Sequence, residues 1–325
     1  MKDAEYGYIT DVPGVAGGHK TDVENGTGAT VLIFEKGARG GVDLLGLASG
    51  SRELPVLDPT HVTPECHGLC LAGGSAFGLA AADGAMKWMS EKNIGYFARV
   101  AVVPIVPAAI IFDLSFKNHE VRPDLSFGYE ACAAASSAPL EMGSVGAGTG
   151  ATVGKILGID NATKSGIGTA SIKTPDGVTI GAVAVVNNLG DVLDRDTGKI
   201  IAGTRDPETG EFADTSKILA AMKSLEEPPL GENTNLVAVA TDAYLDKTGA
   251  KKLARMASAG MARTLAPSMT TFDGDVIFAF STGDLRSDVN RLGVLASEVV
   301  AVAINRAVTE ADGLGVLPAI KDLSR

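Results

Sequence analysis

Residues 231–241 read Gly231-Glu232-Asn233-Thr234-Asn235-Leu236-Val237-Ala238-Val239-Ala240-Thr241, a small polar loop followed at once by an apolar run. The apolar run is typical of a buried strand. A hydroxyl residue directly before it has two interpretations: an ordinary turn, or an internal cleavage point between Asn233 and Thr234. Cleavage would make Thr234 a new N-terminus with a hydroxyl nucleophile and an α-amine on one residue. Because an α-amine titrates near pH ~8, part of it is neutral at physiological pH and can act as a base.

Strands and helices are expected in grouped runs on both sides of this stretch. Before it, the patterns predict strands at 28–34, 42–48, 97–103 and 109–115, helices at 73–92 and 126–135, a glycine-rich loop at 143–154, and a hairpin of 166–173 with 178–186. After it, they predict a strand at 236–242, a helix at 248–265 with Thr248 as N-cap, a strand at 276–281 and a helix at 287–310. Grouped runs rather than strict βαβ repeats indicate an α+β protein.

The polar span 191–233 is the only plausible linker in the chain. It ends immediately before Thr234. A processing site needs an accessible approach, so this placement fits cleavage, although an ordinary surface loop would look the same.

Composition argues against several classes of protein. The chain has 325 residues with a hydrophobic fraction of 45%, enough for one large domain or two. A net charge of -11 argues against nucleic acid and anionic membranes as partners. The longest apolar run, 100–112, is shorter than the ~20 residues of a membrane span, and the N-terminus lacks the apolar core of a signal peptide. Three cysteines do not form a disulfide framework, so we expect a cytoplasmic protein.

No metal or cofactor is expected. His61, Cys66, His67 and Cys70 do not have the spacing of a standard zinc module. Residues 148–155 lack the first glycine and the Ser/Thr of a phosphate-binding loop. Residues 146–151 fit a dinucleotide fingerprint only loosely, without a clear strand before them.

Several short blocks, in order along almost the whole chain, resemble the DmpA-type family of self-processing peptidases. The blocks are residues 9–15 with 18–22, then 72–79, 103–114, 145–151 and 272–275. This family includes β-peptidyl aminopeptidases and nylon-oligomer hydrolases. The resemblance implies an αββα sandwich related to that of ornithine acetyltransferases. It also implies that one domain, 1–325, is cut into fragments 1–233 and 234–325 that stay together, commonly within a homotetramer.

The resemblance also implies roles for individual residues around the nucleophile Thr234. Asp273 and Asp275 are implied to lie beside the nucleophile and orient it. As a pair they could also hold a protonated amine, and a solvated turn is the alternative. Asn187, at the end of an apolar strand, is implied to stabilise an oxyanion, with Asn188 as its competitor and a plain turn as the alternative.

Lys155 follows the glycine-rich loop and is implied to be an active-site lysine, with Lys164 as the less favoured candidate. A lone lysine is otherwise a solvated surface charge.

The segment Gly73-Gly74-Ser75 is expected to begin a helix whose free N–H groups could bind a substrate carbonyl or carboxylate. A capped, buried helix is the alternative. Phe112 lies in a further substrate-binding block, where relatives often carry Tyr. Phe cannot donate a hydrogen bond, so a hydroxyl contact of that kind is missing here.

The implied activity is hydrolysis of an amide or peptide bond through an acyl-enzyme on Thr234. The substrates would be short peptides, β-peptides or ω-amino-acid oligomers with a free amino end. Two alternatives stay open: an acyltransferase of the ornithine-acetyltransferase kind, and a binding protein that keeps the fold without processing. Transfer of an acyl group to an amine rather than to water would indicate the first, and a permanently intact chain the second.

Overall fold

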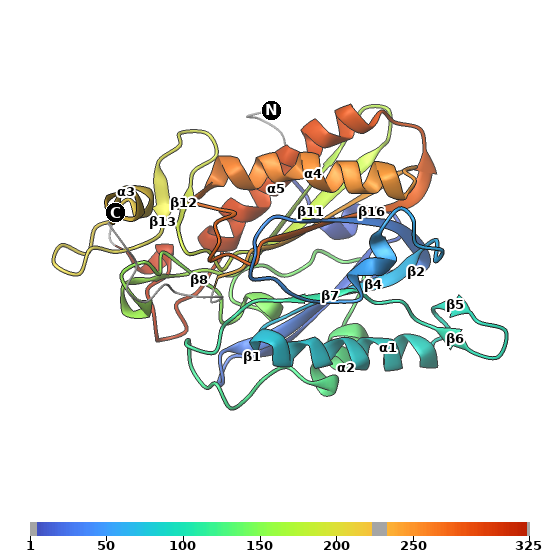
Figure 1. The fold of residues 1–325 in the computed structure, drawn as a ribbon, viewed down its shortest axis with the longest axis horizontal. Coiled ribbons are helices and arrows are strands. Elements are labelled where there is room, and N and C mark those ends of the chain that lie inside the picture. Colours follow the sequence, from blue (N-terminus) through green and yellow to red (C-terminus); the bar gives the residue numbers. More distant parts are fainter. Residues whose placement is uncertain (1–4, 223–232, 324–325) are drawn as a thin grey trace.

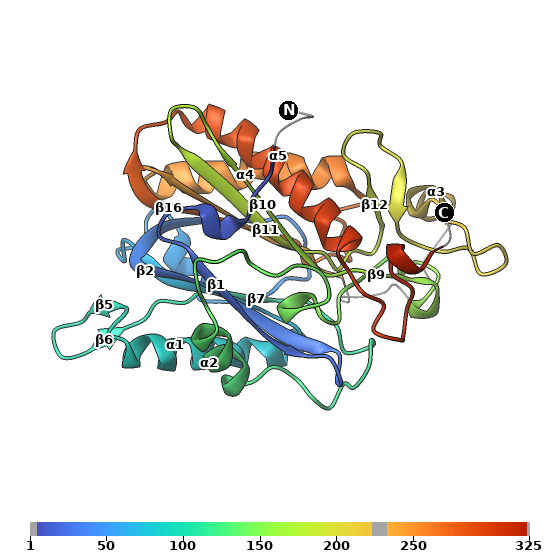
Figure 2. The same cartoon turned by 180° about the vertical axis from the view of Figure 1, so that it is seen from behind.

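The computed structural model describes residues 5–222 and 233–323. Two helix pairs enclose layers of strands (Figure 1). Helices α4 (Lys247–Thr264) and α5 (Val289–Thr309) cover one side, and α1 (Ala81–Glu91) and α2 (Leu125–Ala133) cover the other. The view from behind shows the same succession of layers (Figure 2). This order of helices, strands, strands and helices confirms the expected αββα sandwich.

Strand β2 (Thr27–Leu44) joins the two strand layers. Its residues 39–44 pair antiparallel with β16, whereas its earlier residues pair with β1 and β4. The hydrogen-bonded path runs through β10 (Ile167–Lys173), β11 (Thr179–Val185), β14 (Leu236–Ala243), β16 (Val276–Leu285), β2, β4 (Cys66–Ala72), β7 (Ala108–Ile110) and β3 (Gly50–Arg52), with β1 (Ala16–Asp22) beside β2. Neighbours are antiparallel except β14 with β16 and β4 with β7.

The apolar run 236–241 is explained by burial on both faces of β14. Val237 and Val239 contact the core beneath α4 and α5, whereas Leu236 and Ala238 face the core between the strand layers. Because side chains alternate along a strand, a strand covered on both faces reads as a continuous apolar run. In the inner core, the Phe34 and Phe280 rings are 4.6 Å apart.

Helix α5 is apolar because it is a core helix. It is long and apolar enough to cross a membrane, with a hydropathy of 1.5, yet 67% of that window is buried in the fold. Its backbone lies directly on β10 at Gly168, where a Cβ atom would overlap Ala303 O and Ala307 N. Glycine therefore sets the distance between this helix and the sheet.

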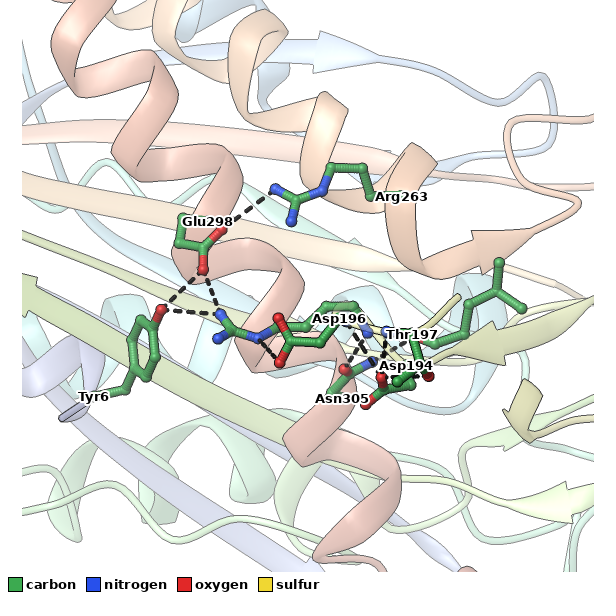
Figure 3. Close-up of polar contacts among 9 residues, drawn as sticks. Tyr6, Asp194, Asp196, Thr197, Arg263, Glu298 and Asn305 are labelled. Carbon is green, nitrogen blue, oxygen red and sulfur yellow. Dashed lines mark hydrogen bonds and ion pairs between the residues drawn. The ribbon is translucent and has the colours of Figure 1, made fainter. Parts of the chain in front are cut away.

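A buried carboxylate, Glu298 on α5, ties the N-terminal segment to the helices (Figure 3). It accepts a hydrogen bond from Tyr6 Oη at 2.8 Å and pairs with Arg195. Arg263 of α4 contacts it at 3.3 Å. Arg195 follows β12 (Asp191–Leu193), so four segments that are distant in the sequence meet at one charge. Two arginines and a phenol offset the cost of burying that carboxylate.

Several expected elements differ in extent or position. The strand expected at 28–34 lies within β2, but of the strand expected at 42–48 only residues 42–44 belong to β2 and residues 45–48 form no strand. The strand expected at 109–115 is shortened to β7. The helix expected at 73–92 begins with a 3-10 turn, Ser75–Ala80. The N-cap of α4 is Asp246 rather than Thr248, because the Asp246 carboxylate accepts a hydrogen bond from Gly249 N. The hairpin of β10 with β11 is confirmed.

The expected buried strand at 97–103 is wrong. This segment forms a small hairpin of β5 (Tyr96–Phe97) and β6 (Val102–Val103), and Val100 at its turn is 94% exposed. Ala98 N donates to Ala101 O at 2.8 Å and Arg99 has a positive φ of 59°, so the chain reverses inside the apolar run.

Part of the expected linker 191–233 is regular structure. It contains β12, β13 (Ile200–Ala202) and α3 (Thr215–Ala221), and β12 also pairs with β15 (Leu265–Ala266). The buried Asp191 carboxylate holds this part together by accepting from Thr204 N and from the backbone and hydroxyl of Thr215. A further short pair, β8 (Thr152–Val153) with β9 (Thr163–Lys164), flanks it. Residues 223–232 of the linker lie outside the described residues.

Substitution of Gly168 by Val should destabilise the fold by ~1–3 kcal/mol or more, because the added side chain would push α5 away from β10. Urea denaturation followed by circular dichroism measures this change. The control is Gly177→Asn, at a turn glycine with φ +91° and open space around its Cβ position. Equal losses of stability in both variants would contradict the packing argument.

Candidate active site

Thr234 lies at the entry to β14 and is almost completely buried, with 2% of its surface exposed. Its backbone N–H donates to the carbonyl of Asn187 at 2.9 Å. Asn187 directly follows the end of β11, and β11 and β14 are antiparallel neighbours. Strand pairing therefore brings these two residues together from positions 47 apart in the chain.

The segment Asp273-Gly274-Asp275 runs beside residues 233–235 as a parallel extension of the β14–β16 pairing. Gly274 N donates to Asn233 O at 2.7 Å, and Val276 N donates to Asn235 O at 3.0 Å. Asp273 and Asp275 are fully buried, so the alternative of a solvated turn is wrong. Both precede β16 rather than lying within it.

Residues 45–48 hold this segment from its other side. Ala48 N donates to Asp273 O at 3.1 Å, and Leu45 N and Gly46 N donate to Asp275 O at 2.9 and 3.1 Å. This contact could not be predicted from the sequence because residues 45–48 carry no chemically distinctive side chain. The only sequence feature that points to it is a glycine next to the end of an apolar strand.

Asp275 fixes the residue that follows Thr234. Its Oδ1 accepts from the backbone N and from Nδ2 of Asn235, both at 2.8 Å, and its Oδ2 accepts from Met269 N at 3.0 Å. Asn235 in turn bonds Asn187 N through Oδ1 and Asn188 Oδ1 through Nδ2. Asn188 also donates to the carbonyl of Pro267, so it serves this supporting network.

Asp273 keeps one carboxylate oxygen unused among the described residues. Its Oδ2 accepts from the backbone and hydroxyl of Thr270 at 2.9 and 2.7 Å, whereas the buried Oδ1 has no hydrogen-bond partner there. Burial raises the pKa of Asp273, and the hydrogen bonds from Thr270, followed by the charge of Lys155, oppose that rise. Burial, followed by repulsion from Asp273, raises the pKa of Asp275 to about 7. Two buried carboxyls this close favour retention of a proton by the pair.

Lys155 reaches the same centre through Asn187. Its Nζ donates to Asn187 Oδ1 at 2.9 Å and to Asn187 O at 3.3 Å. Asn187 O also accepts from Thr234 N, so the lysine ammonium and the nitrogen of the Asn233–Thr234 peptide bond share one carbonyl oxygen. The Asn187 amide is oriented by further contacts, because Oδ1 accepts from Thr152 N and Nδ2 donates to Phe112 O.

Lys164, the less favoured lysine, serves the glycine-rich loop instead. It is completely buried, and its Nζ donates to Gly148 O at 3.2 Å, to Ala151 O at 2.9 Å and to Ser165 O. Burial lowers the pKa of its ammonium to about 7. Its contacts are with backbone carbonyls that shape residues 148–151, the loop that leads to Thr152.

The expected free N–H groups at residues 73–75 are already bonded inside the fold. Gly73 N donates to Gly28 O, Gly74 N to Asp113 Oδ1 at 2.6 Å, and Ser75 N to Ile111 O. The expectation that they are free for substrate is therefore wrong, because Asp113 and two neighbouring strands use them. A substrate contact by these residues would have to come from other atoms. Phe112 meets the site through its carbonyl, which orients Asn187.

Within residues 5–222 and 233–323, no group of three His, Cys, Asp or Glu side chains is arranged to hold a metal. Cys66 and Cys70 are buried in β4, and burial raises the pKa of each thiol to about 12.

The raised pKa of Asp275 predicts a pH-dependent stability of the intact chain. Between its ordinary value of 3.8 and about 7, the folded state holds a proton that the unfolded state has released. Stability should therefore fall as the pH rises through this window, by on the order of 4 kcal/mol. In a Thr234→Ala background, Asp275→Asn should flatten the dependence in urea denaturation at pH 4 to 8. The exposed Glu24→Gln serves as control, and parallel curves for all three proteins would contradict the assignment.

Comparison with known proteins shows which family the chain belongs to. The model of peptidase family S58 matches residues 7–317. An uncharacterized aminopeptidase of Mycobacterium leprae is 37% identical in an alignment 340 positions long that covers 95% of this chain and 92% of the relative. A 6-aminohexanoate-oligomer endohydrolase of Agromyces is 31% identical over 315 residues, which cover 91% of this chain and 84% of that enzyme.

The fold also matches that of a solved structure. The structure of L-aminopeptidase D-Ala-esterase/amidase from Ochrobactrum anthropi, a variant of the Ntn hydrolase fold, matches with a TM-score of 0.72 at 19% identity. The match covers 95% of this chain and 88% of that one. Family, relatives and fold agree over nearly the whole length. The chain therefore belongs to peptidase family S58 and is a hydrolase that acts on amide or peptide bonds.

Proposed function

We propose that the chain cleaves itself between Asn233 and Thr234 and then uses the freed Thr234 as an N-terminal nucleophile. The observation that carries this proposal is the setting of that peptide bond. Its nitrogen is held by Asn187 O at 2.9 Å and its carbonyl by Gly274 N at 2.7 Å, amid two buried carboxyls and a lysine. Perturbed titratable groups gathered around a buried hydroxyl residue are typical of a catalytic centre.

Self-cleavage begins when Thr234 Oγ1 attacks the Asn233 carbonyl carbon. The hydroxyl proton passes to the Thr234 nitrogen, the C–N bond breaks, and an ester between Asn233 and Thr234 remains. Water hydrolyses this ester, which leaves the Asn233 carboxylate, the Thr234 hydroxyl and a free α-amine. The net reaction consumes one water.

In the cleaved enzyme, the α-amine of Thr234 takes the proton from its own hydroxyl as the hydroxyl attacks a substrate amide. Asn187 O holds this amine in place. The nearby Lys155 charge disfavours protonation of the amine and so keeps it available as a base. Asn187 is proposed to donate from its side-chain amide to the oxyanion. Asp273 and Asp275 are proposed to orient the nucleophile, and the unused Oδ1 of Asp273 suits a substrate ammonium.

The proposed substrates are short peptides, β-peptides or ω-amino-acid oligomers with a free amino end. Relatives described as an aminopeptidase and as a 6-aminohexanoate-oligomer endohydrolase support this range, and favour hydrolysis over acyl transfer. Fragments 1–233 and 234–325 should stay together as one domain, because β14 and β16 lie between β11 and β2 in the sheet. Buried, unpaired cysteines fit the proposed cytoplasmic location. A homotetramer rests on the resemblance alone.

The Thr234→Ala variant should remain one chain, whereas the unchanged protein should give two fragments, the second beginning with Thr. Intact mass under denaturing conditions, with N-terminal sequencing, measures this. Thr234→Ser keeps a hydroxyl in the same place and should still be cleaved. An unbroken chain in the unchanged protein after long incubation, or cleavage of the alanine variant, would contradict the proposed nucleophile.

Replacement of Lys155 by Met should raise the pKa of the Thr234 α-amine, because the neighbouring positive charge is lost. The acidic limb of the kcat/KM profile on an amino-acid anilide should then move to higher pH by ~1 unit. Both proteins are measured after cleavage is complete, with fragments co-expressed if cleavage is slow. Lys155→Arg, which keeps the charge, should leave the limb near its original position. An unshifted limb in the methionine variant would contradict this role.

A further inference from the structure

We propose that the backbone N–H of Gly274 is the oxyanion donor of the self-cleavage reaction, an inference that rests on the proposed function. Negative charge develops on Asn233 O when Thr234 attacks the carbonyl. In the intact chain, Gly274 N already donates to this oxygen at 2.7 Å. A donor aimed at the atom that becomes negative strengthens its hydrogen bond as the transition state forms.

The donor is preorganised by hydrogen bonds on both sides of its peptide unit. The pairing of Asn233 with Asp273 sets the register along one edge. Along the other edge, the carbonyls of Asp273 and Asp275 are held by Ala48 N, Leu45 N and Gly46 N. The amide of Gly274 therefore cannot turn away without breaking several backbone bonds. A fixed dipole of this kind needs no reorganisation during the reaction.

Glycine at this position also leaves room for the nucleophile. A Cβ atom on residue 274 would lie 2.5 Å from Thr234 Oγ1 and 2.7 Å from Ala48 O. Residue 274 thus contacts both the carbonyl oxygen under attack and the hydroxyl that attacks it. A side chain at this position would therefore displace the attacking hydroxyl.

The side-chain amide of Asn187, proposed above as the oxyanion donor for substrate, contacts the backbone of residue 112 in the intact chain. Asn187 Nδ2 donates to Phe112 O at 3.1 Å, and Phe112 has no hydroxyl. The backbone of Gly274 provides a donor that depends on no side chain. This explains how the first reaction can be supported although a tyrosine hydroxyl is missing at residue 112.

The test removes the N–H group alone. Glycolic acid, introduced at position 274 by nonsense suppression, replaces the Asp273–Gly274 amide by an ester and adds no atoms. The appearance of the two fragments should slow by ~10²–10³-fold, the typical effect of losing one oxyanion donor. The rate is followed by intact mass, and the melting temperature is compared in a Thr234→Ala background to show that the chain is folded.

The matched control is the corresponding hydroxy acid at position 276. Val276 N donates to Asn235 O at 3.0 Å on the same strand, and the carbonyl of Asp275 before it also accepts hydrogen bonds. This ester removes an equivalent ladder bond without touching the Asn233 carbonyl, so cleavage should change less than tenfold. Equal rates for the position 274 ester and the unchanged protein would overturn the inference, as would equal slowing by both esters.

Gly274→Ala gives a second measurement if the ester at 274 does not fold. It keeps the N–H group but adds the Cβ beside Thr234 Oγ1, and it should slow cleavage by tenfold or more. Cleavage of this variant at the rate of the unchanged protein would contradict the proposed crowding of donor and nucleophile. Failure of the unchanged protein to cleave before Thr234 would contradict the proposed function itself. Normal cleavage there with an unaffected position 274 ester would contradict only this inference.

Discussion

The parallel pairing of residues 233–236 with residues 273–276 is the constraint on which the centre depends. It places Asn233 O on Gly274 N and Asn235 O on Val276 N, and it brings the two aspartates beside Thr234. Parallel strands need a crossover connection, and here the crossover includes α4. Helix α4, which packs on the outer face of the sheet, is thus also part of the connection that places Asp273 and Asp275 beside Thr234.

The same pairing explains why a buried polar cluster is tolerated in the middle of the fold. Buried carboxyls are costly unless they are bonded or neutralised. Asp275 accepts three hydrogen bonds, and its raised pKa favours the neutral form. Asp273 has a buried carboxylate oxygen that makes no hydrogen bond with the described residues. The side-chain amide of the neighbouring Asn233 is also buried and makes none with them. Such unmet polar groups are rare in stable cores and are concentrated at functional sites.

The candidate site residues could be predicted from the sequence together with the family resemblance. The contacts that these residues make could not. Lys155 and Lys164 are both lysines near the glycine-rich loop, and only the folded chain shows that Lys155 contacts Asn187 while Lys164 bonds loop carbonyls. The glycines before α1 were expected to offer free donors, yet Asp113 and adjacent strands use them. Asn187 and Asp113 are remote in the chain from the groups that they bind, so local spacing carries no information about these contacts.

By itself, the sequence determined the periodic features: the buried strand that begins at residue 236, the hairpin before it, the helices after it and the α+β class. These follow from side-chain alternation and helical spacing, which act over a few residues. Only the tertiary structure decided that residues 45–48 hold the aspartate segment and that Gly274 faces the Asn233 carbonyl. Backbone hydrogen bonds between distant segments are nearly independent of side-chain identity. These hydrogen bonds therefore cannot be predicted from the residue types. They are set by the way the strands pair across the whole fold.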